Sequence, residues 1–228
     1  MVKDDWHNPE FALHWDQTAL AGNPTRKEQK DLLIFLLEQK LFSNATLLDL
    51  GIGSGQIEEK LLARRADITV IGVDASKAML DLARTWLDPA RCQLIQHDIG
   101  DTDTLAVPMV QAVIIVQTLH HPPHDKQKAV YRFVHQHLEP GGLFLIMDRI
   151  QLPDEALHPV CADMWDWLER KTDHPDGTTG EEFLNKFQHK HDHPAGLEEH
   201  LHWLRESGFT TTCLHLALNR ALWVGVKV

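Results

Sequence analysis

The chain has 228 residues, enough for one sizeable hydrophobic core and short for two ordinary domains. Its formal net charge of -11 argues against nucleic acid as a partner, because that binding depends on Lys and Arg neutralising phosphates. The three cysteines have neither disulfide nor zinc-site spacing, and we see neither a secretory signal nor an apolar run of membrane-spanning length, so the sequence predicts a cytoplasmic protein without membrane contact.

The first strongly periodic part of the chain predicts a helix followed by alternating strands and helices. An apolar run at residues 32–37, flanked by helix-forming residues, predicts a mostly buried helix over residues 25–41. Short apolar or β-branched runs predict strands at residues 46–50, 68–74, 92–98, 110–117 and 142–148. Helical patterns lie between them, so we expect a parallel sheet that helices cover on both faces.

The last third of the chain departs from this alternation. Residues 157–168 predict an amphipathic helix, and residues 172–196 form a polar, Gly- and His-rich stretch without clear periodicity. Residues 197–204 predict another helix, which Gly208 is placed to cap. Two strands joined around Asn219 then predict an antiparallel hairpin that closes a seven-stranded, mostly parallel sheet in a single α/β domain.

Three glycines follow the first strand, at Gly51, Gly53 and Gly55. A glycine-rich turn between a strand and a helix leaves backbone N–H groups and a helix N-terminus at the carboxyl edge of the sheet, where α/β folds bind ligands. The dinucleotide fingerprint would need glycine at position 56, which is Gln56, and no GK[ST] phosphate loop follows. We therefore expect a ligand other than a pyrophosphate.

At this point the sequence resembles the class I S-adenosylmethionine-dependent methyltransferases, over most of the chain. Their first motif is similar to LLDLGIGSG, which contains Asp49, and acids at Asp74 and Asp98 match those that follow their second and third strands. The family's fourth strand and the loop after it are similar to VQAVIIVQTLHH. Its fifth strand and the turn before it are similar to LEPGGLFLIMD. The resemblance implies a Rossmann-like fold with S-adenosylmethionine as cofactor and S-adenosylhomocysteine as product.

The resemblance also implies a set of cofactor contacts. Asp74 would accept hydrogen bonds from both ribose hydroxyls, a role that suits a carboxylate, and Asp98 would receive the adenine amino group. Taken singly, each of three residues also has a structural explanation: Asp49 as a helix cap, Asp98 as a turn residue and Met79 as a residue of the hydrophobic core. The full set is Asp49, Gly51, Gly53, Gly55, Asp74, Ala75, Met79, Asp98, Ile99 and Gln117.

The loop after the fourth strand indicates which class of molecule receives the methyl group. It reads QTLHHPP over residues 117–123 and lacks the Asn-Pro-Pro-Tyr-type tetrapeptide of the family's adenine- and amide-modifying members, which favours a small-molecule substrate. His120 and His121 are the candidate catalytic residues, because imidazole suits proton transfer near neutral pH; the alternative is a scaffold role beside the methionine end of the cofactor. His189, His191 and His193 suggest a metal, but imidazoles in a polar stretch are usually solvated, and we predict no metal site.

Two segments lie outside the part of the chain that resembles the core of the methyltransferase family. Residues 1–25 resemble the family's short aromatic lid, with Trp15 at its centre, and residues 149–196 form an insertion that could cap the substrate. We assign substrate contacts to Trp15, Trp165 and Arg149, the last through a substrate carboxylate. Core packing for the tryptophans and a surface ion pair for Arg149 remain open as alternatives.

These observations predict an enzyme that transfers a methyl group to oxygen, nitrogen or carbon of a small molecule by in-line displacement. LEPGGLFLIMD, a helical insertion and LRESGF also resemble carboxy-S-adenosylmethionine synthases, which makes such an enzyme the alternative. A non-catalytic S-adenosylmethionine-binding regulatory module is a second alternative, and a protein methyltransferase, which would need an open groove, is a weaker one. The sequence leaves a homodimer open.

Overall fold

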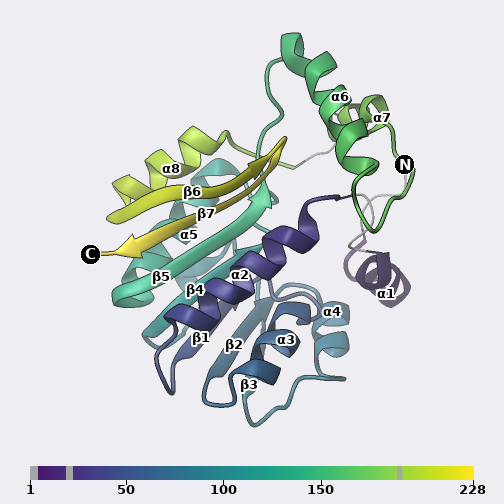
Figure 1. The fold of residues 1–228 in the computed structure, drawn as a ribbon. Helices are drawn as coiled ribbons and strands as arrows, with labels where there is room; N and C mark the ends of the chain where they lie inside the picture. The colour runs from purple at the N-terminus through teal and green to yellow at the C-terminus, as the bar shows by residue number, and fades with distance from the viewer. Residues whose placement is uncertain (1–4, 19–22, 189–191) are drawn as a thin grey trace.

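The structure, a computed structural model, describes residues 5–18, 23–188 and 192–228 (Figure 1). Its centre is a seven-stranded sheet in the order β3-β2-β1-β4-β5-β7-β6. The strands are β1 (Thr46–Leu50), β2 (Thr69–Asp74), β3 (Cys92–Gln96), β4 (Val110–Val116), β5 (Leu138–Arg149), β6 (Phe209–Ala217) and β7 (Arg220–Lys227). β1 to β5 pair in parallel, while β7 runs antiparallel to both β5 and β6. The predicted mostly parallel sheet with an antiparallel C-terminal hairpin is confirmed.

Helices cover both faces of the sheet, as predicted (Figure 1). One face is covered by α2 (Arg26–Lys40), α3 (Gln56–Arg64) and α4 (Lys77–Ala83), and the other by α5 (His124–His137) and α8 (Leu197–Glu206). Successive strand residues point to opposite faces, so that Leu47 packs in the core under α2 and α3 while Leu48 packs in the core under α5 and α8. Both side chains are fully buried, which explains why these adjacent strand positions are both apolar.

The prediction of no periodic structure over residues 172–196 was wrong for part of that range. Residues Gly180–Gln188 form helix α7. Thr179 and Glu182 cap its start reciprocally, because the Glu182 carboxylate accepts from the Thr179 N–H at 2.9 Å and the Thr179 hydroxyl accepts from the Glu182 N–H at 3.3 Å. The helix is short, and Phe183 stabilises it by stacking on Trp165 at 3.9 Å between ring centroids, a long-range contact that periodicity does not reveal.

Two additions flank the sheet. Helix α1 (Pro9–Thr18) packs on α4 through Ala12, Trp15 and Met79. The segment after β5 contains α6 (His158–Glu169) and α7, which share a small core of their own. Short 3₁₀ turns occur at η1 (Thr102–Thr104) and η2 (Glu155–Leu157). Within the described ranges, the helices are too short or too polar to cross a membrane.

Candidate active site

A cavity of 530 Å³ opens at the carboxyl ends of β1, β2 and β4. β1 lies between β2 and β4, at the point where the strand order reverses, and this switch point is where open α/β sheets bind ligands. Eight of the ten predicted cofactor residues line the cavity; they are Gly51, Gly53, Asp74, Ala75, Met79, Asp98, Ile99 and Gln117. His121 and Trp15 line it as well.

The three glycines after β1 have different roles. Gly51 has φ +101°, and a Cβ there would lie 2.2 Å from the Thr118 hydroxyl oxygen, so this position must lack a side chain for the loops after β1 and β4 to meet. Gly53, also in the left-handed region at φ +57°, has open space where a Cβ would be, on the cavity side. Gly55 is the N-cap of α3, and its missing Cβ makes room for Leu87 rather than for a ligand.

The backbone N–H groups of this turn are already engaged within the protein. Those of Gly51 and Ile52 donate to the Val73 carbonyl at 2.7 and 3.0 Å, and that of Gly55 donates to the Ile52 carbonyl at 3.1 Å. The Gly53 N–H donates to Asp74 Oδ2 at 2.8 Å. The expectation that the turn offers free N–H groups was therefore wrong for Gly51, Ile52, Gly53 and Gly55, whose N–H groups fix the turn within itself and against β2.

Asp74 ends β2 at the centre of the cavity wall. Its second oxygen, Oδ1, accepts from the Ser76 N–H at 2.8 Å, while Ser76 caps α4 by accepting from the Met79 N–H. Burial raises the pKa of Asp74, and its two backbone hydrogen bonds oppose that rise. Each carboxylate oxygen has a further lone pair, so both oxygens can accept a hydrogen bond from a bound molecule.

The next strand contributes Asp98 and Ile99. Asp98 is exposed and accepts from the Gly100 N–H at 2.8 Å, an arrangement that fixes the turn, as the alternative interpretation of this residue proposed. Ile99 is buried in the core beneath. Met79 packs with Trp15 and Trp6 and also lines the cavity, so it belongs to the core and to the site at once.

Asp49 does not line the cavity. It is 1% exposed and faces the buried carboxyl of Glu58 on α3, beneath the glycine turn. Burial, together with the facing Glu58, raises the pKa of Asp49 well above its usual range. The structure therefore gives Asp49 a contact below the turn instead of one to a molecule in the cavity.

Gln117 begins the loop after β4 in a left-handed conformation at φ 55°. Its N–H donates to the Met147 carbonyl at 2.8 Å, and its side-chain Oε1 accepts from Arg220 at 3.2 Å. The loop is thus fixed to β5 by its backbone and to β7 by its side chain. This anchoring places the histidines that follow.

The two histidines differ in environment. His120 is buried, and its Nδ1 lies 2.5 Å from Asp148 Oδ1 at the end of β5, while its N–H donates to Asp148 Oδ2 at 3.1 Å. Burial lowers the pKa of His120, although Asp148 favours the charged form, so a neutral ring donates Nδ1–H to the carboxylate. Burial alone would raise the pKa of Asp148, but His120 and the Arg149 N–H outweigh it and lower that pKa.

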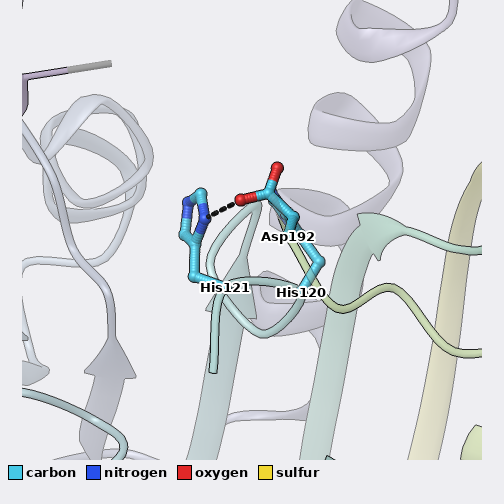
Figure 2. Close-up of side chains that lie close together, drawn as sticks. All are labelled: His120, His121 and Asp192. Carbon is cyan, nitrogen blue, oxygen red and sulfur yellow. Dashed lines mark hydrogen bonds and ion pairs between the residues drawn. The ribbon is translucent and has the colours of Figure 1, made fainter. Parts of the chain in front are cut away.

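His121 faces the cavity and pairs with an acid from the C-terminal part of the insertion. Its Nδ1 lies 3.0 Å from Asp192 Oδ1 (Figure 2). The second oxygen of Asp192 accepts from the Arg149 guanidinium. Burial alone would raise the pKa of Asp192, but the hydrogen bond to His121 and the nearby positive charges hold it well below its usual range. His121 is therefore oriented from behind by a carboxylate.

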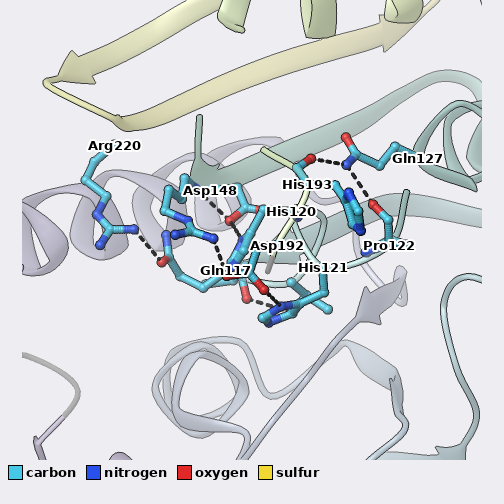
Figure 3. Close-up of polar contacts among 12 residues, drawn as sticks. Gln117, His120, His121, Pro122, Gln127, Asp148, Asp192, His193 and Arg220 are labelled. Carbon is cyan, nitrogen blue, oxygen red and sulfur yellow. Dashed lines mark hydrogen bonds and ion pairs between the residues drawn. The ribbon is translucent and has the colours of Figure 1, made fainter. Parts of the chain in front are cut away.

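Residues 192–195 form a strap along the two histidines (Figure 3). The His193 N–H donates to the His120 carbonyl at 2.7 Å, and the Gln127 amide donates to the carbonyls of Pro122 and His193 at 2.9 and 2.6 Å. The Gln151 N–H donates to the Ala195 carbonyl at 2.9 Å. The strap thus joins the loop after β4 to the segment after β5. His189 and His191 of the same stretch lie outside the described residues.

The predicted substrate contacts are placed in three different environments. Trp15 lines the cavity with Trp6, the two rings meeting edge to face at 5.3 Å. Arg149 is 3% exposed and pairs with Asp192, so it stands behind His121 and does not line the cavity. Trp165 is buried in the small core of α6 and α7, where its indole N–H donates to the Thr178 carbonyl at 2.7 Å. Among the described residues of the insertion, none lines the cavity.

Sequence reasoning missed three residues that shape the site. Trp6 forms part of the roof, Asp148 orients His120 and Asp192 orients His121. The position of Asp148 at the end of a predicted strand was a usable signal, because acids at strand ends gather at the carboxyl edge of a parallel sheet. Asp192 gave no such signal, since only the folded strap places it beside His121.

Comparisons with known proteins add the following. Residues 47–142 match the family model described as a methyltransferase domain. A carboxy-S-adenosyl-L-methionine synthase of Pseudomonas fluorescens (strain SBW25) is 26% identical over 92% of this chain and 91% of its own. A protein of the same description from Pseudoalteromonas translucida is 26% identical over 54% of this chain, and the match spans about half of that relative, 52%. Among solved structures, human N-acetylserotonin methyltransferase in complex with S-adenosylmethionine superposes with a TM-score of 0.64 at 13% identity, over 97% of this chain and 57% of that one. The structural likeness concerns the fold.

Proposed function

The chain belongs to the class I S-adenosylmethionine-dependent methyltransferases, and on that premise we propose that it binds S-adenosylmethionine in the main cavity and methylates a small molecule. The observation that carries the proposal is the convergence of eight predicted cofactor residues on one 530 Å³ cavity at the switch point of the sheet. That volume lies within the range of small-molecule sites, about 300–1,000 Å³.

The residues present fit the cofactor. Asp74 offers an acceptor on each oxygen to the ribose hydroxyls, and Asp98 at the next strand end is placed for the adenine amino group, with Ile99 and Met79 as apolar walls. Gly53 leaves room for the amino-acid tail, which the carbonyl oxygens of the turn can hold, since the N–H groups of Gly51 and Gly53 are engaged. The sulfonium of S-adenosylmethionine supplies an electrophilic methyl group.

The protein's own contribution to the reaction is position and exclusion of water. Trp6 and Trp15 cover the cavity from the N-terminal side. His121 is the member of the histidine pair that lines the cavity, and we assign it the contact with the reacting atom of the acceptor. His120 lies behind it, where Asp148 orients its ring.

The acceptor is a small molecule because the cavity is a pocket roofed by aromatic rings and the chain carries a net charge of -11, which disfavours a polyanion. The free cysteines Cys92, Cys161 and Cys213 suit a reducing compartment, and we place the protein in the cytoplasm.

A second candidate function is synthesis of carboxy-S-adenosylmethionine, which the names of the relatives favour. Its product carries an added carboxylate near the sulfur, which would need a cationic side chain there. Among the described lining residues, Lys126 supplies the one ammonium or guanidinium group, and its amine lies 3.4 Å from Asp101. Arg149 is paired with Asp192 behind His121. These contacts favour methyl transfer over carboxylation.

One experiment tests both functions and the regulatory alternative. The full chain is titrated calorimetrically with S-adenosylhomocysteine, and then incubated with S-adenosylmethionine and a panel of small hydroxylated, amine and carboxylic acceptors. Mass spectrometry of the cofactor pool separates S-adenosylhomocysteine, the product of methyl transfer, from carboxylated S-adenosylmethionine. Binding without turnover would support a regulatory module, and absence of binding would contradict the proposal.

A further inference from the structure

Two imidazoles and a carboxylate converge at the acceptor side of the cavity. One nitrogen each of His120 and His121 and one oxygen of Asp192 all lie within 4.8 Å of one another (Figure 2). The two rings are 4.1 Å apart between centroids. We propose that His120, His121 and Asp192 bind a divalent metal ion, with Zn²⁺ as the best match. The location of this site beside the methyl-transfer position rests on the proposed function.

The donor set is the first argument. Two neutral imidazoles and one carboxylate suit Zn²⁺, and they leave at least one coordination position open for water or substrate, as in catalytic rather than structural zinc sites. The sequence predicted solvated histidines around residue 193, but the strap turns Asp192 of that stretch toward the loop after β4. The candidate ligands thus come from two segments that are 71 residues apart.

The second argument is the support behind His120. Its Nδ1 is used by Asp148 at 2.5 Å, and the backbone N–H of the same residue donates to the other oxygen of that carboxylate at 3.1 Å. A carboxylate that holds one imidazole nitrogen fixes the ring orientation and leaves the other nitrogen as the metal ligand. Asp148 is 1% exposed, so this orientation is built into the end of β5.

The spacing of the three ligands and the charges around them determine how the site would have to adjust to bind a metal ion. His121 Nδ1 and Asp192 Oδ1 are 3.0 Å apart, close to the spacing of two neighbouring ligands on one ion. Neighbouring ligands at about 2.0–2.2 Å from a tetrahedral ion are about 3.3–3.6 Å apart, so a pair as wide as 4.8 Å must contract by more than an ångström. Arg149 on the second oxygen of Asp192 opposes the ion's charge, while the two carboxylates of Asp148 and Asp192 favour it.

The position of the site narrows the acceptor class. Of the three ligands, only His121 lines the cavity, so an ion held here would lie in the cavity wall beside the space for the acceptor. A metal ion binds an acceptor oxygen, lowers the pKa of a hydroxyl and fixes its direction. An ion at this wall therefore favours an acceptor with a hydroxyl or enol oxygen over one with an amine.

The test is calorimetric titration of the chelator-stripped full chain with Zn²⁺, with Co²⁺ absorption as a second reading of the ligand geometry. We expect one equivalent to bind, at least about tenfold more weakly in H121A and D192N, and about 10- to 100-fold more weakly in D148N. The matched control is H202A, which removes an exposed histidine that pairs with Glu206 on α8, and it should bind like the parent.

Two outcomes would overturn the metal site. One is the absence of stoichiometric Zn²⁺ binding to the parent chain; the other is loss of binding in an H189A/H191A double variant while H121A and D192N still bind. S-adenosylhomocysteine affinity is measured on every variant, both as a check of folding and because intact cofactor binding without zinc would remove this inference and leave the proposed function standing.

Discussion

Two sides of the cavity are held in place by different kinds of contact. The cofactor side comprises residues 51–55, 74–79 and 98–99, and the acceptor side comprises residues 117–121, 148–149 and 192–193. On the cofactor side the Gly53 N–H meets Asp74 only 21 residues away, and the N–H groups of Gly51, Ile52 and Gly55 pair with neighbouring backbone. On the acceptor side His121 meets Asp192 from 71 residues away, through side chains. A change on the cofactor side should therefore affect folding or cofactor affinity, whereas a change on the acceptor side should affect turnover.

The largest loss of stability is expected from Gly51→Ala. The residue has φ +101°, and the new Cβ would lie 2.2 Å from the Thr118 hydroxyl oxygen. The left-handed backbone and the overpacking together should lower the free energy of unfolding by about 2–5 kcal/mol, measured by urea denaturation. Gly141→Ala is the matched control, because Gly141 has φ +76° with open space around its Cβ position and should show only the backbone cost. Equal losses in both variants would mean that the contact with Thr118 is unimportant.

The second prediction concerns pH and a histidine beneath the acceptor side. His200 on α8 is 1% exposed, and its Nδ1 lies 2.7 Å from the Tyr131 hydroxyl. Burial lowers its pKa to about 4, so the unfolded chain binds a proton between pH 6.5 and 4 that the folded chain does not. Stability should therefore fall as the pH drops through this window, by about 3 kcal/mol in total.

The variant His200→Gln isolates this contribution from those of the carboxylates and of His120 and His124 nearby. Its unfolding free energy should be lower at pH 7 but less dependent on pH between 6.5 and 4, by up to one proton. If parent and variant show parallel stability curves over that range, the imidazole is not buried in its neutral form.

On the cofactor side, Asp74→Ala should weaken S-adenosylhomocysteine binding by about 1.5–3 kcal/mol, which is about 10- to 150-fold. The reason is the loss of a charged acceptor for the ribose hydroxyls. Asp81→Ala is the control, since that acid lies on α4 in exposed ion pairs with Lys77 and Arg84. Unchanged affinity in calorimetry of the Asp74 variant would contradict the ribose assignment.

The same difference explains what could be predicted from the sequence. The cofactor side follows from local pattern, because an apolar run, a glycine turn and an acid at the next strand end place Gly51 and Asp74 at one edge of any parallel sheet. Asp49 was misplaced because pattern alone does not tell a carboxyl facing a ligand from one facing Glu58 on the next helix.

The acceptor side depends on contacts that no short window of sequence contains. The pairing of His120 with Asp148 requires β4 and β5 to be neighbours, which the predicted sheet allows. The strap requires the insertion to return to the loop after β4, and its position follows from buried contacts such as those of Gln127. Helix α7 was missed for the same reason, since stacking of Phe183 on Trp165 stabilises it.

The smallest change in stability and cofactor affinity is expected from His121→Ala. The side chain is 36% exposed and its hydrogen bond with Asp192 is partly exposed, so unfolding free energy should change by less than about 1 kcal/mol. Cofactor affinity should stay within about twofold and turnover should fall by at least about tenfold, because we assign the ring to the acceptor and not to the cofactor. His202→Ala, in contrast, should leave all three quantities unchanged. If His121→Ala instead lost as much cofactor affinity as Asp74→Ala, the ring would belong to the cofactor side, and the division of the cavity into a backbone-built half and a side-chain-built half would no longer describe how it works.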